Sequence, residues 1–186
     1  MRELAILTFQ TLDGVMQAPK LPEEDLSGGF SHGGWADPFW DEVMASVQRE
    51  AFAEPYEPLF GRKTYDVFAA NQPPSGTPLA DAKKYVVTSN PTGLTWPNSV
   101  ALTGDIPSEI EKLKNGDGPL LQVHGSWQLI QTLLAHNLID EFRLWTFPVL
   151  VGGGKRLFSE DKHVAGLNLI KTDTTTNGVV MSVYRR

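Results

Sequence analysis

The order of apolar patterns along the chain limits the folds that it can form. Short apolar runs such as residues 4–9 are typical of buried strands, and residues 62–69 have apolar side chains at helical spacing. The two kinds of segment alternate, which favours a mainly parallel sheet because parallel strands are joined through helices. Two late strand patterns meet at Thr176-Asn177-Gly178 and predict a C-terminal antiparallel hairpin. We therefore predict an α/β fold: a mixed, mainly parallel twisted sheet with helices on both faces.

The amino-acid composition indicates how many domains the chain forms and which classes of partner are not expected. The 186 residues are 41% hydrophobic and 20% charged, which predicts one globular domain spanning residues 1–186. The formal net charge is −6 and no run of Lys and Arg exceeds two residues, so a nucleic-acid partner is not expected. There is no cysteine and the histidines share no metal-ligand spacing, so neither a disulfide nor a metal site is predicted.

The apolar segments are too short for a membrane protein. No apolar run approaches ~20 residues, and Met1-Arg2-Glu3 leads directly into a strand pattern rather than into a signal peptide. We therefore expect a cytoplasmic protein that has no membrane partner.

A phosphate-binding turn is predicted at Gly61-Arg62-Lys63-Thr64, between a strand pattern and a helix pattern. Gly61 permits a tight turn, and Arg62 and Lys63 bring positive charge. Thr64 adds a hydroxyl to a helix start whose free N–H groups favour anions. The simpler alternative is an ordinary helix start with two solvated cations. The residue types favour a phosphorylated ligand, with a dinucleotide as the first candidate.

Two further polar segments follow predicted strands. Gly125-Ser126-Trp127 begins a helix, and Thr88-Ser89-Asn90 ends a β-branched strand. Ser126 is otherwise explained as a helix N-cap, and Ser89 and Asn90 as turn formers. Ligands of open α/β sheets bind outside the carboxyl ends of the strands, where all these segments should meet. Together they favour a pyrophosphate between two helix starts and a ribose or 2′-phosphate at Ser89 and Asn90.

A long loop precedes the first predicted helix. Residues 17–36 are rich in Gly, Pro, Ser and charged residues, and a loop of this length is typical of a lid over a site. Asp37-Pro38 predicts the helix start, with Asp37 as its N-cap. Trp35 in this loop, Phe39 and Trp40 are candidate substrate-binding residues. Phe39 and Trp40 are candidates for an aromatic wall beside a flat ring, with core packing as the alternative for at least one of them.

Five motifs occur in the order and spacing of one known protein family. They are Thr11-Leu12-Asp13-Gly14, Phe60-Gly61-Arg62-Lys63-Thr64-Tyr65, Val123-His124-Gly125-Ser126, Leu138-Ile139-Asp140-Glu141-Phe142 and Pro148-Val149-Leu150-Val151-Gly152-Gly153-Gly154-Lys155-Arg156-Leu157-Phe158. Through nearly the whole chain they resemble the dihydrofolate-reductase-like family, in its bacterial branch related to the C-terminal reductase domain of riboflavin biosynthesis (RibD). The resemblance implies a three-layer fold that binds NADPH and reduces a heterocycle or a sugar-linked amine by hydride transfer.

The resemblance also implies roles for individual residues in binding NADPH. The implied phosphate, ribose and pyrophosphate contacts are Gly61, Arg62, Lys63 and Thr64, then Thr88, Ser89 and Asn90, then Gly125, Ser126 and Trp127. The loop Asp13-Gly14-Val15 is placed beside the nicotinamide. This chain has His124-Gly125 where the family usually has Gly-Gly, so one glycine remains for close backbone approach.

The predicted chemistry is direct hydride transfer from NADPH to a small molecule that the chain positions. Asp13 is the first candidate for orienting the substrate or delivering a proton, and Asp41 is the second. Lys155 and Arg156 are candidates for binding a substrate phosphate. The most specific prediction is reduction of 5-amino-6-(5-phosphoribosylamino)uracil. Alternatives are dihydrofolate or pterin reduction, a non-catalytic nucleotide-binding module, and a flavin- or phosphosugar-binding protein.

A late strand pattern bears on the oligomeric state. Residues 141–147 alternate as a half-exposed strand should. Their apolar side chains Phe142, Leu144, Trp145 and Phe147 predict a homodimer interface of the kind that relatives often have.

Overall fold

The computed structural model describes residues 1–158 and 166–186. Two compact units are distinguished along the chain: residues 1–6 with 50–141, called unit 1, and residues 7–49 with 142–186, called unit 2. Among the described residues, eight strands follow the order β4-β3-β2-β5-β1-β6-β8-β7. None of the helices in these residues is both long enough and apolar enough to cross a bilayer.

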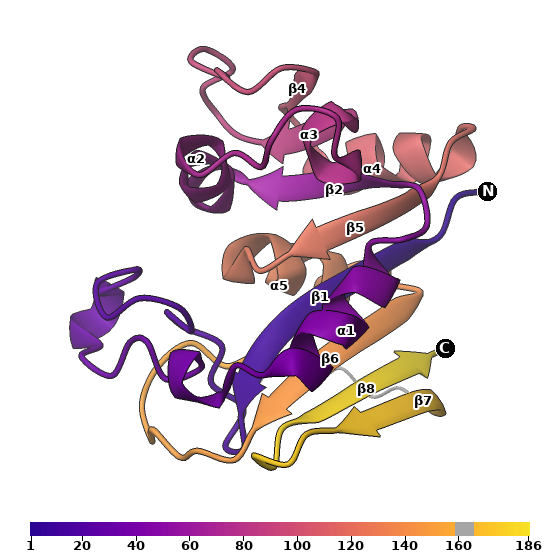
Figure 1. The fold of residues 1–186 in the computed structure, drawn as a ribbon. Helices are drawn as coiled ribbons and strands as arrows, with labels where there is room; N and C mark the ends of the chain where they lie inside the picture. The colour runs from indigo at the N-terminus through magenta and orange to yellow at the C-terminus, as the bar shows by residue number, and fades with distance from the viewer. Residues whose placement is uncertain (159–165) are drawn as a thin grey trace. The chain divides into compact units, whose positions relative to one another are not determined.

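Unit 1 is an alternation of parallel strands and helices. Its strands pair in parallel, with Leu59 of β2 opposite both Tyr85 of β3 and Val123 of β5. The carboxyl ends of β2 and β5 point to the same side, where α2 and α5 begin (Figure 1). Its elements are β2 (Tyr56–Gly61), α2 (Arg62–Ala70), α3 (Pro78–Asp81), β3 (Lys84–Val87), β4 (Ser99–Leu102), α4 (Ile106–Asn115), β5 (Leu120–His124) and α5 (Trp127–Ala135).

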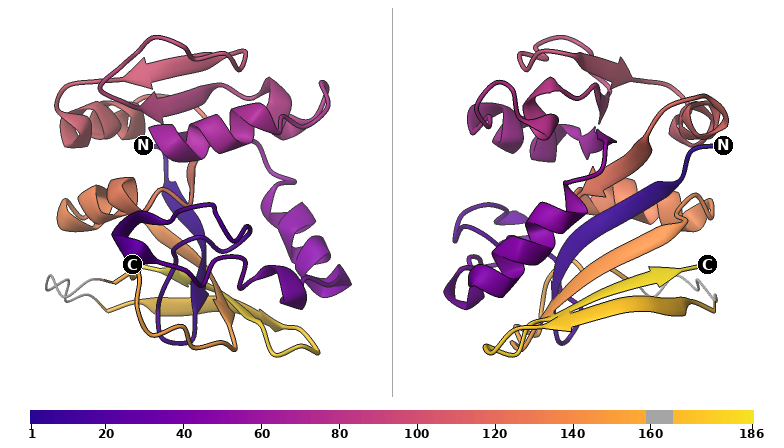
Figure 2. Two further views of the ribbon diagram at one scale, coloured as in Figure 1. Left: turned by 90° about the vertical axis from the view of Figure 1, so that its left-hand side faces the viewer. Right: turned by 45° about the vertical axis from the view of Figure 1, so that its right-hand side comes forward.

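Unit 2 contains the predicted C-terminal hairpin. Strands β7 and β8 pair antiparallel, with a register shift between Leu169 and Lys171, and Figure 2 shows them side by side at the end of the chain. The connecting turn is closed by a hydrogen bond of 3.1 Å from the Gly178 N–H to the Thr175 carbonyl. Together with the parallel strands of unit 1, this hairpin confirms the predicted mixed, mainly parallel sheet. The remaining elements are β1 (Leu4–Thr11), η1 (Ser27–Gly29), η2 (Asp37–Phe39), α1 (Glu42–Ala51), β6 (Glu141–Phe147), β7 (Asn168–Thr174) and β8 (Val180–Arg185). The first residues of β1, the last two of α1 and the first of β6 belong to unit 1.

The first long helix begins later than its sequence pattern predicts. Asp37 opens only the short 3-10 turn η2, and Trp40 after it is extended, with ψ at 127°. Helix α1 starts at Glu42, and the Asp41 carboxylate accepts the Met44 N–H at 2.9 Å. The predicted N-cap at Asp37 is therefore wrong: the extended Trp40 separates η2 from α1, and Asp41 caps the helix.

Strand β6 is not half-exposed, as its alternating pattern suggested. Phe142, Leu144, Trp145 and Phe147 are all buried, on both faces of the strand. Trp145 stacks on Phe9 with ring centroids 5.1 Å apart, and other aromatic rings pack against Phe147. Because the chain itself covers these side chains, they cannot form the predicted dimer interface.

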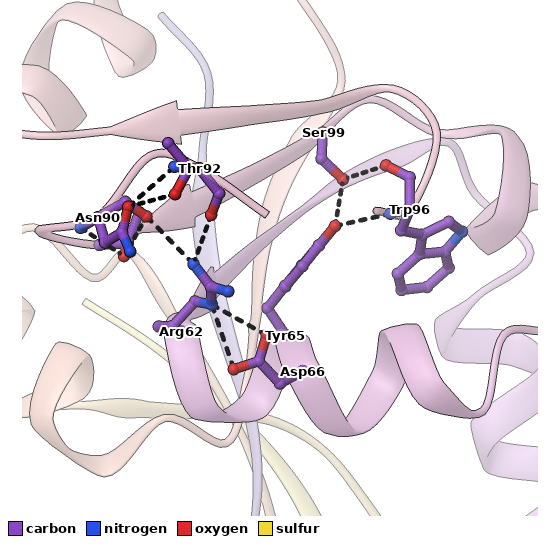
Figure 3. A network of polar contacts seen from close by, with 8 residues as sticks. Arg62, Tyr65, Asp66, Asn90, Thr92, Trp96 and Ser99 are labelled. Atoms are coloured by element: carbon purple, nitrogen blue, oxygen red, sulfur yellow. Dashed lines mark hydrogen bonds and ion pairs between the residues drawn. The ribbon is translucent and has the colours of Figure 1, made fainter. Parts of the chain in front are cut away.

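A buried tyrosine hydroxyl organises the core of unit 1. Phe60, Tyr65, Val86 and Trp96 form one buried cluster of this core. The Tyr65 hydroxyl accepts the Trp96 N–H at 2.8 Å and the Ser99 hydroxyl at 3.2 Å (Figure 3). It thereby holds the segment before β4 against α2, and it satisfies a main-chain donor that is buried away from water.

Removing this hydroxyl should destabilise the protein. Tyr65→Phe leaves the Trp96 N–H without its acceptor, so we expect the free energy of unfolding to fall by about 1–3 kcal/mol. Tyr56→Phe is the matched control, because the Tyr56 hydroxyl is also buried and, among the described residues, has no hydrogen-bond partner. The control should be neutral or stabilising. Urea unfolding of both variants measures the difference, and equal losses would contradict the assigned role of Tyr65.

Candidate functional site

The starts of α2 and α5 in unit 1 are joined by one side chain. The Ser126 hydroxyl accepts the Gly61 N–H at 2.8 Å and donates to the Thr64 hydroxyl at 2.9 Å. Gly61 ends β2, and Ser126 follows β5 by two residues. A Cβ atom at position 61 would lie only 3.2 Å from the Ser126 Oγ, so glycine lets the two turns approach.

These two helix starts have the features of an anion site. Ser126 occupies the N-cap position of α5, as its simpler interpretation predicted, but its hydroxyl makes no capping bond and its backbone is left-handed at φ 66°. Helix α2 likewise has no side-chain cap. Main-chain N–H groups at a helix start favour an anion, and here two such starts lie beside the Thr64 hydroxyl and the exposed Lys63. Gly125 and Trp127 flank Ser126 on the same turn.

Arg62 braces the loop that follows β3. Its Nε donates to the Asp66 carboxylate at 2.9 Å, and its Nη1 donates to the carbonyls of Asn90 and Thr92, each at 3.1 Å (Figure 3). Within the described residues, Nη2 has no hydrogen-bond partner, so one edge of the guanidinium remains to bind a phosphate. The loop is also held internally, because Thr88 bonds the main chain of Asn90.

The structure thus brings most of the predicted cofactor residues together. All ten candidates in unit 1 lie where β2, β3 and β5 end or where α2 and α5 begin. Ser89 and Asn90 are exposed there. Gly14 and Val15 belong to unit 2, where the Gly14 carbonyl accepts the Leu157 N–H at 3.0 Å and Val15 is fully buried.

In unit 2, the Asp13 carboxylate joins two loops. It accepts the Thr11 hydroxyl at 2.5 Å, the Gly152 N–H at 2.8 Å and the Val151 N–H at 3.3 Å. The bond from Thr11 is the main cause that holds the pKa of Asp13 below its usual value of 3.8, and the N–H groups of Gly152 and Val151 act in the same direction against partial burial. The carboxylate is therefore ionised at neutral pH and placed as an acceptor, which does not suit proton delivery.

The two cations predicted for a substrate phosphate already have protein acceptors. Lys155 pairs with Asp25 at 2.6 Å. Arg156 donates to the Asp13 carbonyl and, at 2.7 Å, to the Gly152 carbonyl, and it lies 3.8 Å from the Asp13 carboxylate. Sequence alone could not reveal the Asp25 and Asp13 partners, because they lie 130 and 143 residues away along the chain.

Loop 17–36, predicted as a lid, is anchored by the buried Gln17. The Gln17 amide donates to the carbonyls of Asp25 and Ser27, and its carbonyl oxygen accepts the Lys155 N–H. The Trp35 indole donates to the Gln17 main-chain carbonyl at 2.8 Å. Trp35, predicted as a substrate-binding residue of the lid, is buried and packs in the core of unit 2.

Phe39 and Trp40, the two predicted wall residues, differ from each other in their burial. Phe39 packs partly buried against Phe147 of the core, whereas Trp40 remains 37% exposed. The Lys20 ammonium lies 4.0 Å from the centre of a Trp40 ring and 5.2 Å from that of Phe9. Neither Lys20 nor Phe9 was predicted as a site residue, and the only available signal was that Phe9 lies near the carboxyl end of β1.

Asp41, the second catalytic candidate, caps α1.

Comparison with known proteins assigns the chain to a family. The family model described as RibD C-terminal domain matches residues 2–181. The Bacillus subtilis (strain 168) protein YyaP, itself uncharacterized, is 33% identical over 134 residues, which are 68% of this chain and 71% of YyaP.

Solved structures agree on the fold. A putative riboflavin biosynthesis protein from Shewanella sp. PV-4 is similar with a TM-score of 0.68 at 20% identity, over 100% of this chain and 99% of that one. Dihydrofolate reductase from Enterococcus faecalis, solved in complex with NADP(H), is similar with a TM-score of 0.65 at 16% identity, over 99% and 96% of the two chains. The chain therefore has the predicted dihydrofolate-reductase-like fold.

The role of Asp13 as a link between loops predicts a pH-dependent loss of stability. At neutral pH, Asp13→Asn should lower the free energy of unfolding by about 1–2 kcal/mol, because hydrogen bonds to a charged acceptor are replaced by bonds to a neutral amide. Since folding lowers the pKa of Asp13 below 3.8, its contribution is present at neutral pH and is lost as the pH falls through the folded-state pKa.

Urea unfolding from pH 7 down to pH 3 measures this difference, which should shrink below about pH 4. Asp117→Asn is the control, since Asp117 is exposed. A pH-independent difference between Asp13→Asn and the unmutated protein would contradict the assigned role.

Proposed function

We propose that this chain, which belongs to the RibD C-terminal domain family, is an NADPH-dependent reductase that transfers a hydride to a small heterocyclic substrate. The observation that carries the proposal is the pair of uncapped helix starts joined by Ser126. A related fold that binds NADP(H), that of the Enterococcus faecalis enzyme, supports the choice of cofactor.

The donor groups of unit 1 fit the phosphates of a dinucleotide. Two adjacent helix starts supply main-chain N–H groups and partial positive charge, which suits a pyrophosphate better than one helix start would. Thr64 and Lys63 add a hydroxyl and an exposed ammonium at α2. Arg62 and the Thr88–Asn90 segment supply the donors for a further phosphate, and this is why NADPH is preferred over NADH in the proposal.

The chain's own contribution is to bind and orient. NADPH, when bound, supplies the hydride. Ser126 keeps the two helix starts in register, and Arg62 holds the loop after β3 so that its polar groups stay in place. Preorganised donors of this kind lower the entropic cost of aligning two reactants. Hydride transfer needs no nucleophilic side chain, and this agrees with Asp13 and Asp41 both serving as acceptors for main-chain N–H groups.

Family membership suggests 5-amino-6-(5-phosphoribosylamino)uracil as the first substrate to examine. The Shewanella protein, named for riboflavin biosynthesis, has the same fold and supports this choice. Use of Lys155 or Arg156 for the substrate phosphate would require breaking their bonds to Asp25 and Gly152. Dihydrofolate and other pterins are therefore tested together with the uracil derivative, since they need no residue to bind a substrate phosphate.

Arg62→Ala should weaken NADPH binding by about tenfold, because a charge-assisted contact is lost. We expect a smaller effect on NADH, since Arg62 contacts the Asn90 and Thr92 carbonyls, in the loop assigned to the 2′-phosphate. Calorimetric titration of both cofactors measures the two ratios. Arg49→Ala is the control, because Arg49 is an exposed arginine on α1 in unit 2.

Equal weakening of NADPH and NADH would place Arg62 at the pyrophosphate instead. Failure of the unmutated protein to bind NADPH at saturating concentration would refute the proposed function. Binding without any NADPH oxidation, across the uracil derivative, dihydrofolate and other pterins, would favour the non-catalytic nucleotide-binding module.

A further inference from the structure

The imidazole of His124 is enclosed by aromatic rings at the end of β5 in unit 1. His124 is the last residue of β5, and it is only 6% exposed. Four rings have centroids 5.4 to 6.0 Å from that of the imidazole, those of Phe52, Tyr56, Phe60 and Phe68. We call these four residues the aromatic shell. The side chain of His124 is therefore held inside unit 1, although the next residues, Gly125 and Ser126, belong to the candidate cofactor site.

The aromatic shell connects His124 to the start of α2. Phe60 directly precedes Gly61, and Phe68 lies on α2. Packing of the imidazole against these two rings therefore joins the end of β5 to β2 and α2 inside the core. It is a second link between the two helix starts, in addition to the hydrogen bonds of the Ser126 hydroxyl.

The turn that follows His124 has two consecutive left-handed residues. The φ angle is 57° at Gly125 and 66° at Ser126. Serine rarely adopts this conformation, which persists only where neighbouring contacts hold it. The Ser126 hydroxyl holds the turn from within, and the buried imidazole holds the residue that enters it.

The amide of Gln122 requires a neutral imidazole. Gln122 is fully buried, and its Nε2 lies 3.0 Å from the Nε2 of His124. An amide nitrogen only donates, so the imidazole Nε2 accepts, and the proton of the neutral ring is on Nδ1. Both nitrogens of an imidazolium are donors. Protonation of His124 would therefore set two donors against each other and remove this hydrogen bond.

The other titratable groups near the aromatic shell are neutral, paired or exposed. Burial raises the pKa of Tyr56 to about 12, so its hydroxyl is neutral. Glu57 on β2 pairs with Arg2, and Asp66 on α2 pairs with Arg62. The remaining charged residues of these elements and of residues 50–55 are exposed, and they are Glu50, Glu54 and Lys63. Because solvent screens exposed charges, the direct contact with Gln122 dominates.

We propose that His124 is a positioning residue of the cofactor site, and that it holds Gly125 and Ser126 for the pyrophosphate of NADPH only while its imidazole is neutral. The proposal rests on the proposed function and adds a pH dependence to it. Protonation of His124 removes the bond from Gln122 and loosens the turn, so NADPH affinity falls in acid. By linkage, bound NADPH favours the neutral ring to the same extent.

A direct contact between a charged His124 and the cofactor phosphates is the competing possibility. An imidazolium beside two helix starts would attract an anion, and aromatic faces tolerate a cation. However, the ring is buried, and its Nε2 is engaged with Gln122, two residues back along β5. The two possibilities predict opposite pH dependences, because acid would tighten NADPH binding if the imidazolium were the ligand.

Replacing His124 by a residue that does not titrate separates the two possibilities. In His124→Gln, the amide oxygen lies as far along the side chain as the imidazole Nε2 and is able to accept the Gln122 amide. Between about pH 8 and about pH 5.5, where histidine titrates, the unmutated protein should lose about fivefold more NADPH affinity than the variant. Rapid fluorescence titration measures both proteins. Titration of the 2′-phosphate of NADPH is common to both and cancels in the comparison.

His136→Gln is the matched control, because His136 is an exposed histidine directly after α5 in unit 1. Its pH profile should equal that of the unmutated protein. Thermal unfolding of each protein at both pH values checks that the fold is retained. Nitrogen-15 NMR of the unmutated protein tests the role without any substitution, since saturating NADPH should move the protonation of His124 to lower pH.

The proposal is overturned if the unmutated protein and His124→Gln have the same pH profile, or if NADPH leaves the protonation of His124 unchanged. It is also overturned if acid tightens NADPH binding in the unmutated protein but not in the variant, which would make His124 a phosphate ligand. NADPH binding by the unmutated protein at pH 8 tests the proposed function separately. Intact binding at pH 8 with no effect of His124 therefore leaves the proposed function standing.

Discussion

One hydroxyl group, that of Ser126, carries the arrangement of the candidate cofactor site in unit 1. It joins the end of β2 to the start of α5 and reaches Thr64 on α2. A serine with φ at 66° is strained, typically by about 1–3 kcal/mol, and it persists because its surroundings hold it. The two hydrogen bonds are part of that support. A glycine at this position would adopt the same backbone without strain, but it would leave the two helix starts unconnected.

Unit 2 is held by polar side chains where regular structure is sparse. Loop 17–36 contains only the short turn η1, so few of its main-chain groups are paired within a helix or a strand. The Gln17 side chain instead forms hydrogen bonds with three main-chain groups, and the Asp13 carboxylate accepts the N–H groups of residues 151 and 152. Buried and half-buried main-chain groups need such partners. The side chains of Gln17 and Asp13 are therefore engaged in holding the main chain of this unit.

Much of the fold could be predicted because local patterns and fold rules agree. Strands and helices at residues 56–70 and 120–135 follow from apolar periodicity, and the hairpin follows from Asn177-Gly178. The predictions were wrong where contacts and backbone conformation, rather than the local sequence pattern, determine the structure. Residues 141–147 alternate in sequence, yet both faces of β6 are covered, so the pattern did not report exposure. Asp37 and Asp41 are both good caps, and only the extended Trp40 between them determines which one begins α1.

The candidate cofactor residues were identifiable from sequence because parallel strands bring their carboxyl ends to one edge of unit 1, and small, hydroxyl and basic residues follow those strands. Such residues form the turns Gly61-Arg62-Lys63-Thr64 and Gly125-Ser126. Residue type and order along the chain are enough to identify these two turns, without knowledge of their contacts. Only the tertiary structure determined which basic side chains form ion pairs, because an ion pair depends on distance in space and not along the chain. Lys155 pairs with Asp25 and Arg156 with Asp13, whereas the Lys20 ammonium lies over the rings of Trp40 and Phe9.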